Sequence, residues 1–310
     1  MIVEAGDDGI VERVQEWARR QEDVRAVLRT GSRARRDGTV DAFSDHDIEV
    51  YTTDPGRYED GGWVEELGPV VVQVGLEGPW DNPARLVFFE GGVKVDFQVV
   101  PVDLLARMAA DGLDDLHERG YEVLWDPDGT AALLPAAGGE VAAELPDAEE
   151  FEELCAEFWF EMAHLPRCLA RGELWVAKSR DWTTKELLES VIEWHALTRE
   201  GTGHDVWYGG TRMRSWAAPG VWERLPDTFG GFTADDALRA ARATADLFAQ
   251  LAKEVAEAHG FAYPHKAEGA IRPTLDALPR GWALIGSRRP GGVGPRRGAG
   301  PRPGGSRGGP

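Results

Sequence analysis

Apolar residues in the first half of the chain recur mainly at every second position or in short continuous runs, and both patterns are typical of β-strands. Gly91-Gly92 between two of these runs predicts a β-hairpin. Apolar residues at helical spacing predict helices at residues 10–23 and 102–110. A sheet with accompanying helices is therefore expected, with strands at residues 24–28, 45–52, 70–74, 84–90, 93–100 and 121–125.

From Leu145 onward the spacing of apolar residues becomes helical. The first long helix is expected to stop near Pro166, and the last one at Gly260. Three residue pairs have the capping pattern of helix starts: Asp147 with Glu150, Thr183 with Glu186, and Thr233 with Asp236.

These patterns predict an α+β protein in two domains. A sheet domain is expected at residues 1–144, followed by a helical-bundle domain at residues 145–283. Residues 284–310 consist mostly of Gly, Pro and Arg, so they are predicted to be a disordered tail.

Length and composition fit a globular protein. A chain of 310 residues is long enough for two cores, and it contains no run of about 18 apolar residues, so no membrane span or membrane partner is predicted. No basic region followed by an apolar stretch marks the N-terminus. Cys155 and Cys168 lack metal-site spacing. A cytoplasmic protein with reduced thiols is expected.

The net charge of −20 is unevenly distributed. Residues 280–310 carry seven arginines and no acid, so the first 279 residues carry 27 basic and 54 acidic groups, a net charge of −27. A body this acidic repels the nucleic-acid backbone and attracts cations, so no nucleic-acid partner is predicted. The alternative interpretation of the charge is solubility alone.

The strongest candidate chemistry lies at residues 29–50. A Gly31-Ser32 turn follows a predicted strand, and a second strand carries Asp45 and Asp47 on one face with Ile48 on the other. Two adjacent carboxylates repel each other unless a cation lies between them, and oxygen ligands suit Mg²⁺. An isolated Asp-x-Asp is commonly a solvated strand edge. A strand followed by Gly-Ser, a short loop and an Asp-x-Asp strand is a much rarer sequence pattern.

Asp96 lies in the second arm of the predicted hairpin. It shares a face with Lys94 and Gln98, opposite Val95 and Phe97. An acid in a core strand needs a partner; the alternative is an edge strand with a wet face. His46 lies between the two other aspartates, so its side chain is expected to point away from them, into the core.

The sequence resembles the nucleotidyltransferase superfamily that includes DNA polymerase beta, in which Gly-Ser precedes two metal-binding aspartates. Residues 85–105 look like the third-carboxylate hairpin of the aminoglycoside 6-adenylyltransferases, also called streptomycin adenylyltransferases. Residues 157–159 and 171–178 resemble the helical domain of that family. The similarity covers about residues 10–275.

The resemblance implies a nucleotidyltransferase domain with a mixed sheet. It also implies transfer of AMP from ATP to a hydroxyl of an aminoglycoside, and the expected acceptor is the 6-hydroxyl of streptomycin. Mg²⁺ and ATP are the implied cofactor and co-substrate, a cationic aminoglycoside is the implied partner, and a monomer or weak homodimer is expected. Alternatives are a nucleotidyltransferase acting on another small molecule or a protein, and a catalytically silent nucleotide-binding regulator. The acidic body disfavours a polymerase-like enzyme.

The resemblance also implies residue roles. Asp45, Asp47 and Asp96 match the catalytic metal-binding acids, and Asp96 either shares a metal or accepts the proton of the attacking hydroxyl. Gly31 and Ser32 match the phosphate turn, and Lys178 matches a lysine near the triphosphate. Arg33 begins an arginine-rich loop that either binds phosphate or is solvated. The candidates for binding the substrate are Glu157, Trp159 and Glu161.

Overall fold

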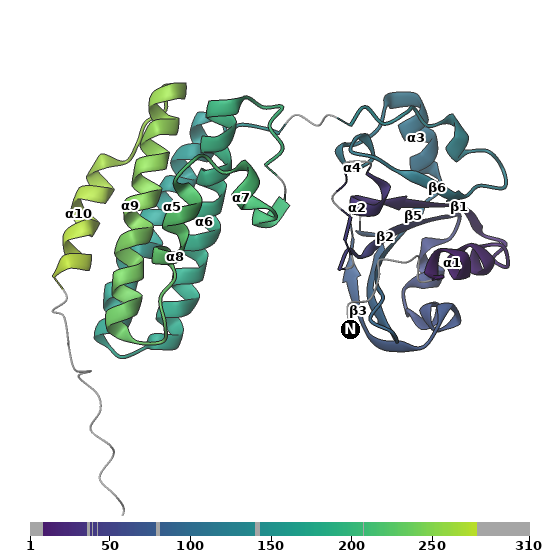
Figure 1. Ribbon diagram of the computed structural model, residues 1–310, viewed down its shortest axis with the longest axis horizontal. Coiled ribbons are helices and arrows are strands. Elements are labelled where there is room, and N and C mark those ends of the chain that lie inside the picture. Colours follow the sequence, from purple (N-terminus) through teal and green to yellow (C-terminus); the bar gives the residue numbers. More distant parts are fainter. Residues whose placement is uncertain are drawn as a thin grey trace, which may run out of the picture. The chain divides into compact units, whose positions relative to one another are not determined.

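The N-terminal part of the chain folds around a six-stranded sheet in the computed structural model (Figure 1). The strand order is β3-β4-β5-β2-β1-β6. β2 and β5 are parallel, whereas every other neighbouring pair is antiparallel, so the predicted mixed sheet is confirmed. The strands are β1 (Val24–Thr30), β2 (His46–Thr52), β3 (Val70–Glu77), β4 (Pro83–Phe89), β5 (Lys94–Pro101) and β6 (Glu122–Trp125).

The structure describes residues 9–35, 38, 40–41, 43–78, 81–139, 143–206 and 208–277. The chain divides into two compact units, Met1–Val141 and Ala142–Pro310. This division lies close to the predicted domain boundary after residue 144. The predicted disordered tail at 284–310 lies outside the described residues.

An aromatic cluster covers one face of the sheet. Trp17 of α1 (Ile10–Ala18) is fully buried and stacks on Trp63 of the 3₁₀ segment η2 (Gly62–Leu67), with ring centroids 4.9 Å apart. Trp63 in turn meets the edge of Phe97 on β5 at the same centroid distance. Large aromatic groups dominate the burial here, so this face is the main core of the unit.

The opposite face of the sheet has a smaller core. Leu105 and Met108 of α3 (Asp103–Asp111) pack there against Tyr51 of β2 and Val100 of β5. The short helix α4 (Asp115–Glu118) follows and contributes His117, which is buried. Asp47 of β2 and Asp96 of β5 alternate with Ile48 and Phe97 of the main core, so both aspartates lie on this same face.

The second unit is a helical bundle, as predicted (Figure 1). Its core lies between α5, α6 and α9, where Phe158 of α5 stacks on Phe248 of α9. The helices are α5 (Ala148–Ala170), α6 (Leu174–Glu200), α7 (Met213–Trp216), α8 (Val221–Thr228), α9 (Ala234–His259) and α10 (His265–Asp276).

Three predicted helix boundaries are wrong. α1 ends at Ala18, not near residue 23. α5 continues through Pro166 to Ala170, because the residues beyond the proline, Cys168 and Leu169, pack into the core. α6 begins at Leu174, so the predicted start at Thr183 lies inside it. The other two predicted starts are confirmed: Asp147 accepts a hydrogen bond from the Glu150 amide, and Thr233 accepts one from the Asp236 amide.

Cys155 and Cys168 are both buried and form no disulfide. Within the described part of the chain, no helix combines the length and apolar character needed to cross a bilayer.

Candidate active site

Three carboxylates meet on the sheet face that α3 covers only in part. Asp47 of β2 pairs with Asp96 of β5 in the parallel register, and Asp45 immediately precedes β2. One carboxylate oxygen of each residue lies within 4.8 Å of the others. The structure therefore brings together the three acids that the sequence singled out.

Gly31 allows the first turn after β1 to approach these acids. Its φ of 65° is in the left-handed region, which favours glycine. A Cβ at this position would lie 1.8 Å from Oδ2 of Asp47. Any side chain here would displace that carboxylate, so Gly31 and Asp47 are matched in shape.

Lys94 holds two of the three acids. Its Nζ donates hydrogen bonds to Oδ2 of Asp45 at 2.6 Å and to Oδ2 of Asp96 at 2.7 Å. Burial alone would lower the pKa of Lys94, but the hydrogen bonds and charges of the two aspartates outweigh burial and raise that pKa. The ammonium group thus offsets part of the negative charge of the cluster.

Asp47 is the acid whose charge is least compensated. Burial, followed by repulsion from Asp45 and Asp96, raises the pKa of Asp47 to about 6. In addition, Oδ1 of Asp96 is buried and makes no hydrogen bond within the described residues. A hard divalent cation would satisfy both groups, so the donor set fits Mg²⁺.

Arg33 shapes the loop that leads to Asp45. Its guanidinium donates from Nη2 to the carbonyl of Ser44 at 2.8 Å and from Nε to the carbonyl of Asp45 at 3.0 Å. Arg33 and Ser32 lie in the short helix α2 (Gly31–Ala34), which follows β1 directly. The side chain of Arg33 therefore positions the backbone next to the carboxylate cluster.

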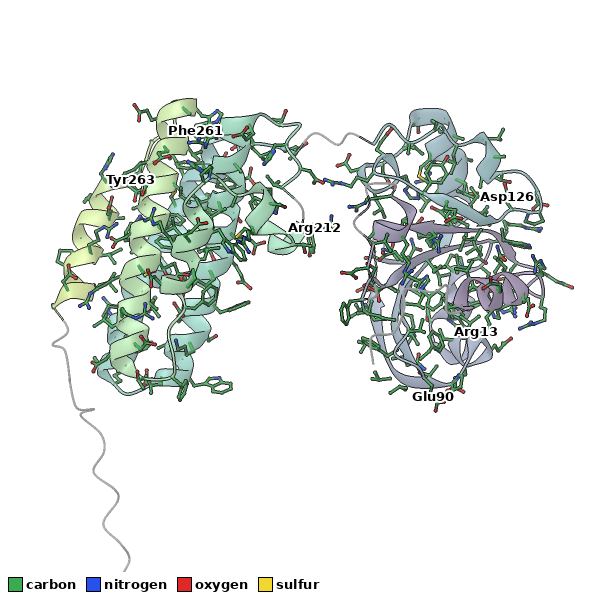
Figure 2. The ribbon with its side chains drawn as sticks, viewed as in Figure 1. Arg13, Glu90, Asp126, Arg212, Phe261 and Tyr263 are labelled. Carbon is green, nitrogen blue, oxygen red and sulfur yellow. The ribbon has the colours of Figure 1, made fainter. Side chains whose placement is uncertain are left out.

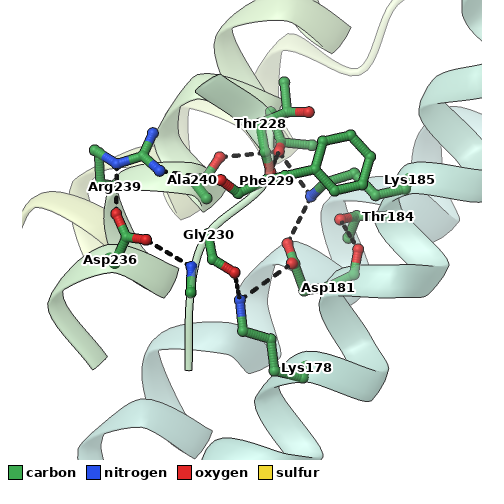
Figure 3. Close-up of polar contacts among 12 residues, drawn as sticks. Lys178, Asp181, Thr184, Lys185, Thr228, Phe229, Gly230, Asp236, Arg239 and Ala240 are labelled. Carbon is green, nitrogen blue, oxygen red and sulfur yellow. Dashed lines mark hydrogen bonds and ion pairs between the residues drawn. The ribbon is translucent and has the colours of Figure 1, made fainter. Parts of the chain in front are cut away.

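Lys178 belongs to a polar network in the helical unit (Figure 3). Its Nζ donates to the carbonyl of Gly230 at 2.6 Å and lies 3.9 Å from Oδ2 of Asp181. Lys185, which is buried, donates to Asp181 at 2.6 Å and to the Thr244 hydroxyl at 2.9 Å. The network fastens the segment before α9 to α6.

The three predicted substrate-binding residues lie on α5 in different environments. Glu157 is exposed. Glu161 is largely buried, and its Oε1 accepts a hydrogen bond from Arg180 at 2.6 Å. Trp159 is fully buried, and its Nε1 donates to the hydroxyl of Tyr263, labelled in Figure 2, so its side chain offers no surface to a ligand.

The sequence interpretation missed two features near the carboxylates. The first is the contact of Lys94 with Asp45. The sequence showed only that Lys94 shares a strand face with Asp96. The second is a buried network in which Glu49 accepts a hydrogen bond from the Tyr51 hydroxyl at 2.6 Å and lies 2.9 Å from Nε2 of His117. His117 had no pattern around it in the sequence that indicated such a role.

Comparison with known proteins supplies the family. A family model described as streptomycin adenylyltransferase matches residues 7–277. The aminoglycoside 6-adenylyltransferase of Bacillus subtilis (strain 168) is 25% identical over 271 residues, covering 84% of this chain and 93% of that protein. The protein of the same name from Campylobacter jejuni is 24% identical over 264 residues, covering 81% and 88%.

Among solved structures, an aminoglycoside 6-adenyltransferase from Bacillus subtilis aligns with a TM-score of 0.42 and 20% identity, covering 87% of this chain and 98% of that chain. The match of the family model spans both the sheet unit and the helical unit. The chain therefore belongs to the streptomycin adenylyltransferase family.

Proposed function

We propose that this protein transfers AMP from ATP to a hydroxyl group of an aminoglycoside, releases pyrophosphate and thereby inactivates the drug. The 6-hydroxyl of streptomycin is the expected acceptor. The observation that carries the proposal is the meeting of Asp45, Asp47 and Asp96 within 4.8 Å in a chain of this family.

The acids have a direct role in this chemistry. Asp45, Asp47 and Asp96 would hold Mg²⁺. The chemistry that Mg²⁺ would supply there is neutralisation of charge on the triphosphate during in-line displacement at the α-phosphorus. Lys94 keeps Asp45 and Asp96 close together by donating to both.

The acceptor hydroxyl must lose its proton as it attacks. Asp96 is the candidate to take it, because it lies on the strand next to Asp47 and one of its buried oxygens makes no hydrogen bond within the described residues. Gly31 and Ser32 are proposed to face the phosphates. The Ser32 hydroxyl makes no hydrogen bond to another described residue, so it is available for this role.

Four further roles rest on the sequence alone. Arg33 and Lys178 are proposed to contact the triphosphate, although each already donates to backbone carbonyls. Glu157 and Glu161 are proposed to attract the cationic acceptor. Of these two acids, Glu157 has the accessible carboxylate, because Glu161 is paired with Arg180.

Mass spectrometry tests the proposal directly. The protein is incubated with MgATP and a panel of aminoglycosides that includes streptomycin, and each drug is examined for the added mass of AMP. We expect modified streptomycin with Mg²⁺ and none when EDTA is present. Modification of another acceptor alone would replace the expected substrate, and no ATP turnover with any acceptor would favour the silent regulator.

A further inference from the structure

A cavity of about 390 Å³ lies on the same sheet face as the three carboxylates. Glu49 of β2 and Gln98 of β5 line it and are paired in the parallel register. Asp47 and Asp96 form the pair two positions earlier, so alternation places both pairs on one face. Two strand residues span about 7 Å, and the cavity is therefore a direct neighbour of the carboxylate cluster.

The walls of the cavity are mostly apolar. The apolar residues that form them are Val100 of β5, Leu104 and Met108 of α3, Leu113 before α4 and Leu116 of α4. Pockets for small molecules typically have a volume of about 300–1,000 Å³, apolar walls and a few polar groups that fix the ligand. The cavity has this composition.

The polar residues between the two strands have unused hydrogen-bonding capacity. Glu49 is only 5% exposed, and both of its hydrogen bonds end on Oε2. Its Oε1 makes no hydrogen bond to a described residue, and the same is true of the carboxamide of Gln98. A carboxylate oxygen and an amide group are therefore available side by side.

The neighbours of Glu49 fix its orientation. His117 lies between Glu49 and Asp114, and its Nδ1 is 2.7 Å from Oδ1 of Asp114. Burial alone would lower the pKa of His117, but hydrogen bonds to these two acids raise it to about 9, so both ring nitrogens donate at neutral pH. Burial and the charge of Glu49 raise the pKa of Tyr51, which keeps its hydroxyl a donor.

The charges around the cavity decide which ligands fit. Three acids, Glu49, Asp111 and Asp114, face two bases, Arg107 and His117. With His117 protonated, the lining carries one excess negative charge. Such a cavity disfavours the phosphates of a nucleotide and favours a cationic group.

We propose that this cavity binds an amino or guanidinium group of the acceptor, with Glu49 and Gln98 as its hydrogen-bonding partners. The inference rests on the proposed function, because it places the acceptor hydroxyl at Asp96. A single substituted ring bridges the distance between a hydroxyl there and a cation beside Glu49. Recognition of the cation would then orient the hydroxyl for attack.

The test compares ligand binding in three variants of the full chain. Glu49→Gln removes the charge but keeps an oxygen for Tyr51 and His117, and Gln98→Met removes the amide at similar length. Glu90→Gln is the matched control, because Glu90 lies in an exposed turn. Isothermal titration calorimetry measures the Kd of streptomycin and, separately, of MgATP.

We expect Glu49→Gln to raise the streptomycin Kd about tenfold or more and Gln98→Met about two- to tenfold. The Kd of MgATP should change less than about twofold in both, and Glu90→Gln should resemble the wild type. Should Glu49→Gln fail to fold, Gln98→Met decides the question, since its side chain makes no hydrogen bond to a described residue.

Unchanged streptomycin binding in the folded variants would overturn the proposal. A larger effect on MgATP than on streptomycin would also overturn it and assign the cavity to the nucleobase, because a Gln carboxamide also pairs with adenine. AMP transfer is assayed separately. If the variants bind streptomycin more weakly but the wild type transfers no AMP, the cavity is a binding site for the cation and the proposed enzymatic function is rejected.

Discussion

Gly31 approaches the carboxylate of Asp47 so closely that a Cβ on this glycine would lie 1.8 Å from Oδ2. Gly31→Ala must therefore displace the carboxylate of Asp47. Because a displacement of about 1 Å at a reacting centre can cost about 10²-fold in rate, we expect kcat/KM for AMP transfer to fall by about that factor. Steady-state kinetics of the purified variant measures this.

Gly91→Ala is the matched control. Gly91 also has a left-handed φ, 88°, but a Cβ there would meet no atom within 4 Å. The Gly91→Ala variant should lose about 1–2 kcal/mol of unfolding free energy because of backbone strain alone, and its activity should be unchanged. Equal activity of the two variants would contradict the proposed fit between Gly31 and Asp47.

Asp47→Asn should separate activity from stability. Because the pKa of Asp47 is raised to about 6, ionisation destabilises the fold as pH rises from 3.8 to about 6, and this cost is fully present at pH 7. The variant should therefore have a higher Tm than the wild type at pH 7 without Mg²⁺, while turnover is abolished. Asp45→Asn should also abolish turnover but lower the Tm, because it weakens the contact with Lys94.

Differential scanning fluorimetry with and without Mg²⁺ distinguishes these cases. The wild type should gain stability on addition of Mg²⁺, and both variants should gain less. Asp103→Asn, an exposed site at the start of α3, is the control and should behave as the wild type. Near-normal activity in both Asp45→Asn and Asp47→Asn would reject the metal assignment.

Lys94→Met should leave Asp45 and Asp96 without their ammonium partner. We expect a lower Tm than the wild type in EDTA, and a larger increase in Tm when Mg²⁺ is added, since the metal then offsets more repulsion. Lys94→Arg retains the charge and should show a smaller effect. If the Mg²⁺-induced change in Tm is the same in Lys94→Met and the wild type, Lys94 does not compensate the charge of this cluster.

The network around His117 predicts a loss of stability at alkaline pH. The folded-state pKa of His117 is raised from 6.5 to about 9, so its contribution is fully present below pH 6.5 and is lost as pH rises through about 9. Glu49, Asp114 and the Tyr51 hydroxyl are the polar groups that face it. Urea denaturation from pH 6 to pH 10 should show this decline in the wild type and a weaker one in His117→Gln.

Local patterns singled out Asp45 and Asp47, because alternation put both on one face of a strand. The Gly91-Gly92 hairpin put Asp96 in a strand paired with β4, and only the family resemblance assigned Asp96 to the same site as the other two acids. The contact of Lys94 with Asp45 was not predictable in this way, because it depends on the parallel register in which His46 lies beside Val95. Register between strands about 50 residues apart is set by tertiary packing, which no local window contains.

In the helical unit, a local sequence pattern was present but predicted the wrong helix start. Thr183 and Glu186 have the spacing of a helix cap, but the same residue types also occur inside helices. Here α6 runs through them without a break, and the buried ion pair of Asp181 and Lys185 lies in this part of the helix. The true start at Leu174 follows Glu173, which makes no side-chain capping hydrogen bond, so no signal marked it. Trp159 is buried by contacts with Phe248 of α9 and with Tyr263, which lie about 90–100 residues away and outside any local window.

Pyrophosphate release tests the central claim most directly. The wild type is incubated with ATP, Mg²⁺ and streptomycin, each omitted in turn, beside Asp47→Asn and Asp96→Asn. We predict release only when all three components are present, none with Asp47→Asn, and a kcat lowered by about 10²–10⁴-fold with Asp96→Asn that recovers partly at higher pH if this residue is the base. Full activity in Asp96→Asn, or release by the wild type without Mg²⁺, would contradict adenylyl transfer at the three-carboxylate site.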